Sequence, residues 1–101
     1  MIARVWRGAT RAEDAEAYAA YMGATGVHAL HGTPGNEGVF MLQRIDGDRA
    51  EFVVLSLWSS EEAIRAFAGE DISVAVFYPE DDRFLIEREL TATHYEVVDR
   101  R

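Results

Sequence analysis

The stretch from Glu51 to Gly69, EFVVLSLWSSEEAIRAFAG, constrains the fold more than any other part of the chain. Its first part, Phe52 to Trp58, is almost wholly apolar and rich in residues that favour β-strands, which predicts a central strand covered on both faces. Ser59 stands three residues before Glu62, the spacing of a capping box, and this predicts the start of a helix. An apolar stripe at helical spacing follows, and Gly69 is expected to end the helix.

The N-terminal segment predicts a strand followed by a helix. Residues 2–8 alternate so that Ile2, Arg4 and Trp6 share one face. Thr10 and Glu13 have the spacing of a second capping box, so we expect Thr10 to be the N-cap of the first helix. The buried stripe of that helix is marked by apolar side chains three or four residues apart. Its members are Ala15, Tyr18, Ala19 and Met22.

Glycines and a proline predict a loop over residues 26–38, with the first helix ending near Gly26 or fraying toward Leu30. Strand 39–44 then leads through the turn at 46–48 into the strand of the opening stretch, as a hairpin. The second of these strands is apolar on both faces, so we expect it at the centre of the sheet.

The C-terminal third predicts a short helical segment over residues 70–78, capped by Asp71 and stopped by Pro79. Residues 84–89 are ambiguous between strand and other structure. Residues 92–99 are expected to form the last strand.

The resulting β-α-β-β-α-β order predicts an α+β, ferredoxin-like fold with a four-stranded antiparallel sheet. Both helices would cover one face, leaving the other bare. Apolar residues such as Phe40, Leu42 and Val54 on that bare face would exceed the usual exposed apolar patch. We therefore expect a homodimer in which two sheets pack face to face as a dimeric α+β barrel.

Composition narrows the class of protein. A chain of 101 residues predicts one domain spanning residues 1–101. No apolar run approaches the roughly 20 residues of a membrane span, and the N-terminus lacks the apolar core of a signal peptide, so a cytoplasmic protein without a membrane partner is expected. The net charge of −8 makes nucleic acid a poor partner. Without cysteine, no disulfide or thiolate metal site is expected.

The passage LSLWSSEEAIRAF, the closing HYEVV and the element order resemble the antibiotic biosynthesis monooxygenase (ABM) superfamily of dimeric α+β barrels. The resemblance covers about residues 2–98 and is most specific from Trp58 to Ile64. The motifs TPGNEG, FAGED and YPED resemble a bacterial subgroup of that superfamily.

The resemblance to this superfamily implies one of several activities. Some relatives are monooxygenases that oxidise electron-rich aromatic polyketides without a cofactor, some cleave haem, and others isomerise or cyclise small molecules. The haem-cleaving branch uses an Asn on the first strand, a Trp on the second helix and a His soon after it. This chain has no Asn on that strand, Phe67 at the Trp position and no His over 68–78, which argues against haem cleavage.

The cleft of this fold lies on the helix-covered face. We expect Arg4 to stabilise a substrate anion there and His94 to accept its proton, as catalytic residues. Aromatic and apolar side chains would stack a planar ring. These predicted substrate-binding residues are Trp6, Tyr18, Tyr21, Met22, Phe67, Phe77 and Tyr78. Simpler interpretations stay open, because Arg4 is also suited to an ion pair and His94 to a place within the sheet.

The leading hypothesis is therefore a homodimer that binds a planar aromatic or polyketide-like small molecule, as a monooxygenase that needs no cofactor or metal. The alternatives are a dimer that binds a small molecule or haem without turnover, and a purely structural or regulatory dimer.

Overall fold

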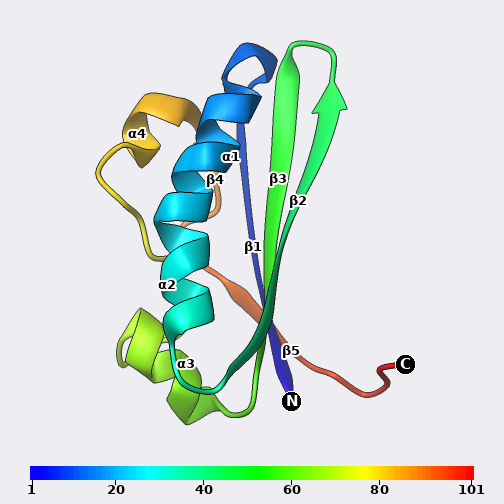
Figure 1. The fold of residues 1–101 in the computed structure, drawn as a ribbon, viewed down its shortest axis with the longest axis vertical. Helices are drawn as coiled ribbons and strands as arrows, with labels where there is room; N and C mark the ends of the chain where they lie inside the picture. The colour runs from blue at the N-terminus through cyan, green and yellow to red at the C-terminus, as the bar shows by residue number, and fades with distance from the viewer.

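The computed structural model describes residues 1–101 and has one antiparallel sheet with helices against one of its faces (Figure 1). The elements follow in chain order, with a single 3₁₀ turn at Ala12–Asp14 after the first strand. They are β1 (Ile2–Arg11), α1 (Ala15–Ala24), α2 (Gly26–Gly32), β2 (Asn36–Asp46), β3 (Arg49–Trp58), α3 (Glu61–Ala68), α4 (Asp81–Phe84), β4 (Leu85–Arg88) and β5 (Thr93–Glu96).

The predicted α+β ferredoxin-like sheet is confirmed, but it has five strands instead of four. Strands β2, β3 and β1 lie in that order, and both β4 and β5 pair with β1. Strand β4 pairs with residues 8–10 and β5 with residues 2–5, so two short strands share the fourth position. The chain leaves the sheet between them because Leu90 O and Ala92 N bond to the backbone of residues 73–75. The predicted last strand, 92–99, is shorter and spans Thr93–Glu96.

Register decides which side chains face the helices. Strands β1 and β3 pair along their whole length, from Ile2 opposite Trp58 to Arg11 opposite Arg49. Since side chains alternate along a strand, the even-numbered residues of both strands face the helices. Val54 is one of them and is buried, so its predicted place on the bare face is wrong.

The other face of the sheet carries no helix (Figure 1). Phe40 and Leu42 lie on it as predicted, and they are 52% and 50% exposed. We call this surface the open face. Its larger apolar members include Val5, Phe40, Leu42, Val53, Leu55, Leu57 and Tyr95.

The core lies between β3 and the helices. Tyr18 of α1 is fully buried, with its ring edge-on to Phe52 at a centroid distance of 5.0 Å. Trp58 is fully buried as well, and its Nε1–H donates to Ser56 Oγ at 2.8 Å. The predicted stripe of α1 is confirmed, because Ala15, Tyr18 and Met22 are buried while Ala19 packs against the core.

Two predicted helix starts are displaced. Thr10 is not an N-cap, since pairing with β3 extends β1 to Arg11, and the Thr10 hydroxyl donates to the Arg11 carbonyl. Helix α3 is capped by Ser60, whose Oγ accepts from Ala63 N at 3.1 Å. The predicted capping box of Ser59 and Glu62 is therefore wrong by one residue.

The predicted stop at Gly69 is confirmed by its φ of 93°, a conformation that glycine adopts without strain. The hairpin turn is confirmed too, with Gly47 at a φ of 62°. Each of these glycines lies at the end of a helix or strand. Glycine is a common signal for such an end, so both positions could be predicted from the sequence.

The predicted loop over 26–38 is wrong at its start, because residues 26–32 form α2. The chain breaks at Thr25, with φ −115° and ψ −90°, and then resumes a helix that buries Leu30. The spacing of four from Met22 to Gly26 to Leu30 continues the stripe of α1.

The predicted helix over 70–78 is also wrong. This segment, which we call the strap, forms turns and one bridge between Val74 and Thr91. Asp71 caps no helix: its carboxylate accepts from the backbone N–H and the hydroxyl of Ser73, and these bonds lower the pKa of Asp71. The Ile72 and Val74 carbonyls bond to Arg4 and the Ser73 carbonyl bonds to Ala92 N, so they are not available for a helical ladder.

None of the helices has both the length and the hydrophobicity that crossing a membrane requires.

Candidate functional site

A cavity of about 40 Å³ lies between the sheet, the helices and the strap. Strands β1 and β3 form its floor, α1 and α2 one wall, and α3 and the strap the rest. Eight of the eleven residues around it are hydrophobic. They are Arg4, Trp6, Met22, Gly26, Leu30, Val54, Ser56, Phe67, Ala75, Val76 and Tyr78.

Arg4 is the one charged side chain in this lining, and it is only 5% exposed. Its guanidinium donates to the Ile72 carbonyl, to the Val74 carbonyl at 3.2 Å and to His94 Nε2 at 3.0 Å. All three partners are neutral, and Arg4 has no carboxylate within ion-pair distance. Burial lowers the pKa of Arg4. The cavity therefore contains a buried positive charge that no acidic residue compensates, which is costly for a folded protein.

His94 reaches Arg4 and not the cavity. It lies on β5 directly opposite Arg4 in the register. Because Arg4 Nη1 donates to Nε2, the ring proton belongs on Nδ1. Burial, and then the charge of Arg4, lower the pKa of His94, against a smaller opposing effect of Glu61. The imidazole is thus neutral near pH 7.

The predicted substrate-binding residues divide into two groups. Trp6, Met22, Phe67 and Tyr78 line the cavity. Phe77 lies behind it, edge-on to Trp6 at a centroid distance of 6.2 Å.

Tyr18 and Tyr21 do not reach the cavity. Tyr18 is locked in the core between Phe52 and Phe84. Tyr21 Oη accepts from the backbone N–H of Glu80 at 3.0 Å. The structure therefore brings Arg4, with four of the seven predicted binding residues, to one site.

Sequence reasoning missed the other lining residues. Gly26 and Leu30 were hidden by the expected loop, although their spacing from Met22 signalled a continuing helix face. Ala75 and Val76 come from the strap, whose position depends on contacts with Arg4 and residues 90–92. No local pattern encodes those contacts.

A buried carboxyl supports the wall of the cavity from behind. Asp81 is 2% exposed, and its Oδ2 accepts from Tyr78 N at 2.7 Å. Its Oδ1 and the hydroxyl of Tyr18 are both buried without a hydrogen-bond partner. Burial is the main cause that raises the pKa of Asp81, and likewise the pKa of Tyr18. Asp81 thereby fixes the backbone of Tyr78 against the cavity.

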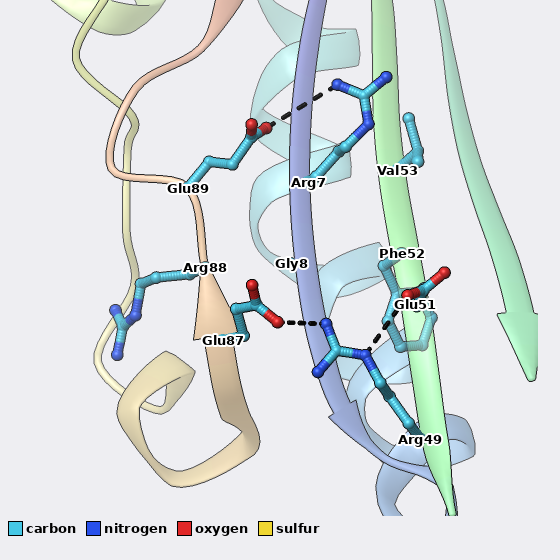
Figure 2. Close-up of a pocket in the computed structure, with 9 residues that line it drawn as sticks. All are labelled: Arg7, Gly8, Arg49, Glu51, Phe52, Val53, Glu87, Arg88 and Glu89. Carbon is cyan, nitrogen blue, oxygen red and sulfur yellow. Dashed lines mark hydrogen bonds and ion pairs between the residues drawn. The ribbon is translucent and has the colours of Figure 1, made fainter. Parts of the chain in front are cut away.

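A second hollow, of about 330 Å³, lies on the open face and is charged (Figure 2). Arg7 pairs with Glu89 at 3.9 Å, and Arg49 pairs with Glu87 and, at 3.4 Å, with Glu51. These charges compensate one another, in contrast to the isolated charge of Arg4. The hollow is open and largely polar, so we place the candidate binding site in the cavity at Arg4. No three His, Cys, Asp or Glu side chains in the structure are grouped so as to hold a metal ion.

The helix layer, the antiparallel sheet and the cavity between them define a ferredoxin-like α+β protein with a small, largely apolar cavity. The sequence pattern of the antibiotic biosynthesis monooxygenase family matches residues 1–76. The chain belongs to this family. No curated protein matches it in sequence.

Solved structures give the same fold. A candidate antibiotic biosynthesis monooxygenase from Nitrosomonas europaea is 16% identical with a TM-score of 0.68, over 98% of this chain and 100% of that one. One from Bacillus cereus is 15% identical with a TM-score of 0.64, over 100% and 94% of the two chains. The haem degrader MhuD from Mycobacterium tuberculosis, with two haems bound in its active site, is 20% identical with a TM-score of 0.59, over 100% and 99%. At these identities the likeness concerns the fold alone.

Proposed function

We propose that this protein binds a planar aromatic small molecule at the cavity and oxidises it as a monooxygenase without a cofactor. The observation that supports this most is the buried Arg4, which has no acidic partner and lies among aromatic and apolar side chains. Such a cation stabilises a phenolate or enolate, and the surrounding rings stack a planar molecule.

The chemistry needs only an electron-rich anion and oxygen. A ring CH₂ beside a carbonyl loses a proton to give an enolate, whose negative oxygen is held by Arg4. The enolate reduces O₂: one oxygen atom becomes a new carbonyl, and the other leaves as water with the two hydrogens of the CH₂. The carbon loses four electrons and O₂ gains four, so no further reductant is required. In this scheme the proton passes to water, because the His94 ring lies outside the cavity lining and its Nε2 already accepts from Arg4, which leaves the predicted role of His94 as proton acceptor without support.

The proposed assembly is a homodimer of single-domain chains. The open face carries half-exposed Phe40 and Leu42 beside Val53 and Leu55 at the centre of the sheet. A second copy packed face to face would cover this patch, and a two-fold axis would make the contact self-complementary.

The residues present do not fit a haem held by histidine. No histidine lines the cavity, and the one nearest to it, His94, has its Nε2 occupied by Arg4. Phe67 lies beside Trp58 at a centroid distance of 6.2 Å, and it stands at the position where haem-cleaving relatives carry a functional Trp. We therefore derive no step through haem.

The second candidate is binding without turnover. It is favoured by the absence of any acid or base in the lining other than Arg4 and Tyr78, since burial raises the pKa of Tyr78 and keeps its phenol protonated. In that case Arg4 would hold an aromatic anion that never reacts.

Oxygen uptake separates the two candidates. Anthrone, a planar ketone with a ring CH₂, is the probe, and anthraquinone is the product expected from it. Uptake of one O₂ per anthraquinone, well above the rate without protein, is the expected result. At least a tenfold loss is expected for Arg4→Gln, and an unchanged rate for Arg65→Gln, which removes a charge from the exposed side of α3. Binding of anthrone without oxygen uptake supports the second candidate.

A further inference from the structure

The cavity is too small for the proposed ligand as it stands. Sites for small organic molecules span roughly 300–1,000 Å³, whereas this cavity measures about 40 Å³. Its floor is the centre of a sheet and one wall is the paired helices α1 and α2, which are fixed by core packing. The strap is the wall that lacks both a helix and a regular strand.

Few hydrogen bonds hold the middle of the strap, residues 72–75, in place. Its backbone meets residues 90–92 through two hydrogen bonds, Ala75 N to Leu90 O at 3.0 Å and Ala92 N to Ser73 O at 2.8 Å. Toward the floor, its Ile72 and Val74 carbonyls accept from Arg4. Ala75 is the one buried residue of the strap, and Val74 is 50% exposed. Phe77, edge-on to Trp6, and Tyr78, bonded to Asp81, anchor the end of the strap, so Arg4 is the polar latch of its middle part, residues 72–75.

We propose that the strap is a lid latched by Arg4, and that the anionic group of an aromatic ligand opens it by replacing the Ile72 and Val74 carbonyls on the guanidinium. The inference rests on the proposed function in taking the occupant of the cavity to be a planar aromatic molecule.

The exchange is favourable at Arg4. A carboxylate or phenolate makes charge-assisted hydrogen bonds that are roughly twice as strong as bonds between neutral groups. It also gives a buried, uncompensated cation its missing counter-charge. The released carbonyls of Ile72 and Val74 can bond to water once the strap lifts, because Val74 already lies half exposed.

His94 keeps the latch in place during this exchange. It accepts from β5 a hydrogen bond of Arg4 Nη1, the nitrogen that also donates to the Ile72 carbonyl, and this bond can persist when the carbonyls of the strap leave. A neutral ligand of the same shape that forms no anion offers Arg4 no counter-charge, so it displaces the carbonyls less readily at the same concentration. The latch thus favours ligands that carry a negative charge or, like a ketone that becomes an enolate, form one at Arg4.

A matched pair of probes tests this. 2-Naphthoate and 2-naphthamide have the same ring system and differ in charge. Calorimetry with the full-length protein is expected to show at least tenfold tighter binding of 2-naphthoate. Hydrogen exchange at the Ala75 and Ala92 amides is expected to accelerate at least fivefold when 2-naphthoate is bound, although ordinary ligand binding slows exchange. Exchange in the core strand, at Val54, should not accelerate.

Variants of Arg4 separate the hydrogen bonds that hold the strap from the positive charge of the side chain. Arg4→Gln removes both, so the Ala75 and Ala92 amides should exchange rapidly without ligand and the preference for 2-naphthoate should fall below twofold. Arg4→Lys keeps the charge but loses the forked contact with two carbonyls; it should loosen the strap and retain the preference. Arg65→Gln, matched in charge change, should behave as the wild type. Far-UV circular dichroism confirms that each variant is folded.

Each of the other possible results contradicts a specific part of the proposal. Tight binding of 2-naphthoate with unchanged or slower exchange at Ala75 and Ala92 overturns the lid. Equal binding of both probes overturns the anion latch while leaving the proposed function standing. Binding of neither probe contradicts the proposed function, and the inference falls with it.

Discussion

Arg4 and His94 face each other across paired strands, with 3.0 Å between the guanidinium Nη1 and the imidazole Nε2. The contact joins a buried cation to a neutral base at the floor of the cavity. It keeps the imidazole deprotonated, because protonation at Nε2 would remove the acceptor and place two positive charges together. Charge, orientation and proton affinity at this site are therefore set by one pair of residues.

The pair predicts how stability depends on pH. The folded-state pKa of His94 lies below its unfolded value of about 6.5. The unfolded chain therefore binds more protons between those two values, and stability is lost as the pH falls through that window. Urea denaturation at pH 8 and pH 5 should give a smaller difference in unfolding free energy for His94→Gln than for the wild type. We expect a change of under about 1 kcal/mol, because the ring is partly exposed. An identical difference in both proteins would show that His94 is not shifted.

The two tyrosines of α1 should respond differently to loss of the hydroxyl. Tyr18 Oη is buried without a partner, so Tyr18→Phe should leave the free energy of unfolding unchanged or raise it by up to about 1 kcal/mol. Tyr21 Oη accepts from Glu80 N, so Tyr21→Phe should lower it by about 1 kcal/mol. Urea denaturation at pH 7 measures both. A loss above about 1 kcal/mol for Tyr18→Phe would mean that its hydroxyl has a partner, such as an internal water.

The proposed dimer can be tested within one strand. Leu42 and Ile45 of β2 are about equally exposed, at 50% and 51%, but pair with Val53 and Ala50 and so point to opposite faces. Leu42→Glu on the open face should yield a monomer by light scattering at micromolar concentration, because it buries an unpaired charge in the interface. Ile45→Glu should remain a dimer. A monomeric wild type contradicts the proposed assembly outright.

Filling the cavity should block binding while sparing stability. A Cβ on Gly26 would come within 3.1 Å of Met22 Cε and 3.4 Å of Tyr78 Cε2, so Gly26→Ala occupies the cavity and needs only a small shift of flexible Met22. We expect at least a tenfold loss of 2-naphthoate affinity, with the melting temperature within a few degrees of the wild type. Gly23→Ala, in open space on α1, should bind normally. Equal affinities of the two variants for 2-naphthoate would show that the ligand binds outside this cavity.

The fold was predictable because its strongest signals are local. Residues 52–58 and the helix after them carry β-strand and helix periodicity in sequence, and both elements exist with Gly69 as the stop. The hairpin turn was equally plain. The start of α3 was missed by one residue because Ser59 and Ser60 are adjacent, and only the contact of Ser59 N with Gly35 O selects Ser60 as the cap.

The site was only partly predictable, because it is closed by long-range contacts. Arg4, Trp6 and Met22 could be placed from periodicity on β1 and α1. The position of the strap could not be predicted, since its Ile72 and Val74 carbonyls are held by Arg4, a residue far away in the sequence. Tyr18 was wrongly assigned to the binding site, because its ring lies entirely in the core. Periodicity shows which face of a helix is buried, but not whether a side chain on that face reaches a cavity or the core.

The central claim is that the cavity at Arg4 takes up a planar aromatic molecule. Amide and indole ¹H–¹⁵N spectra titrated with 2-naphthoate test it most directly. We predict saturable shifts at the Trp6 indole, Ser56, Phe67 and Ala75, all around the cavity, with Phe40 and Leu42 of the open face unmoved. Shifts confined to the open face, or none at millimolar ligand, would contradict the account.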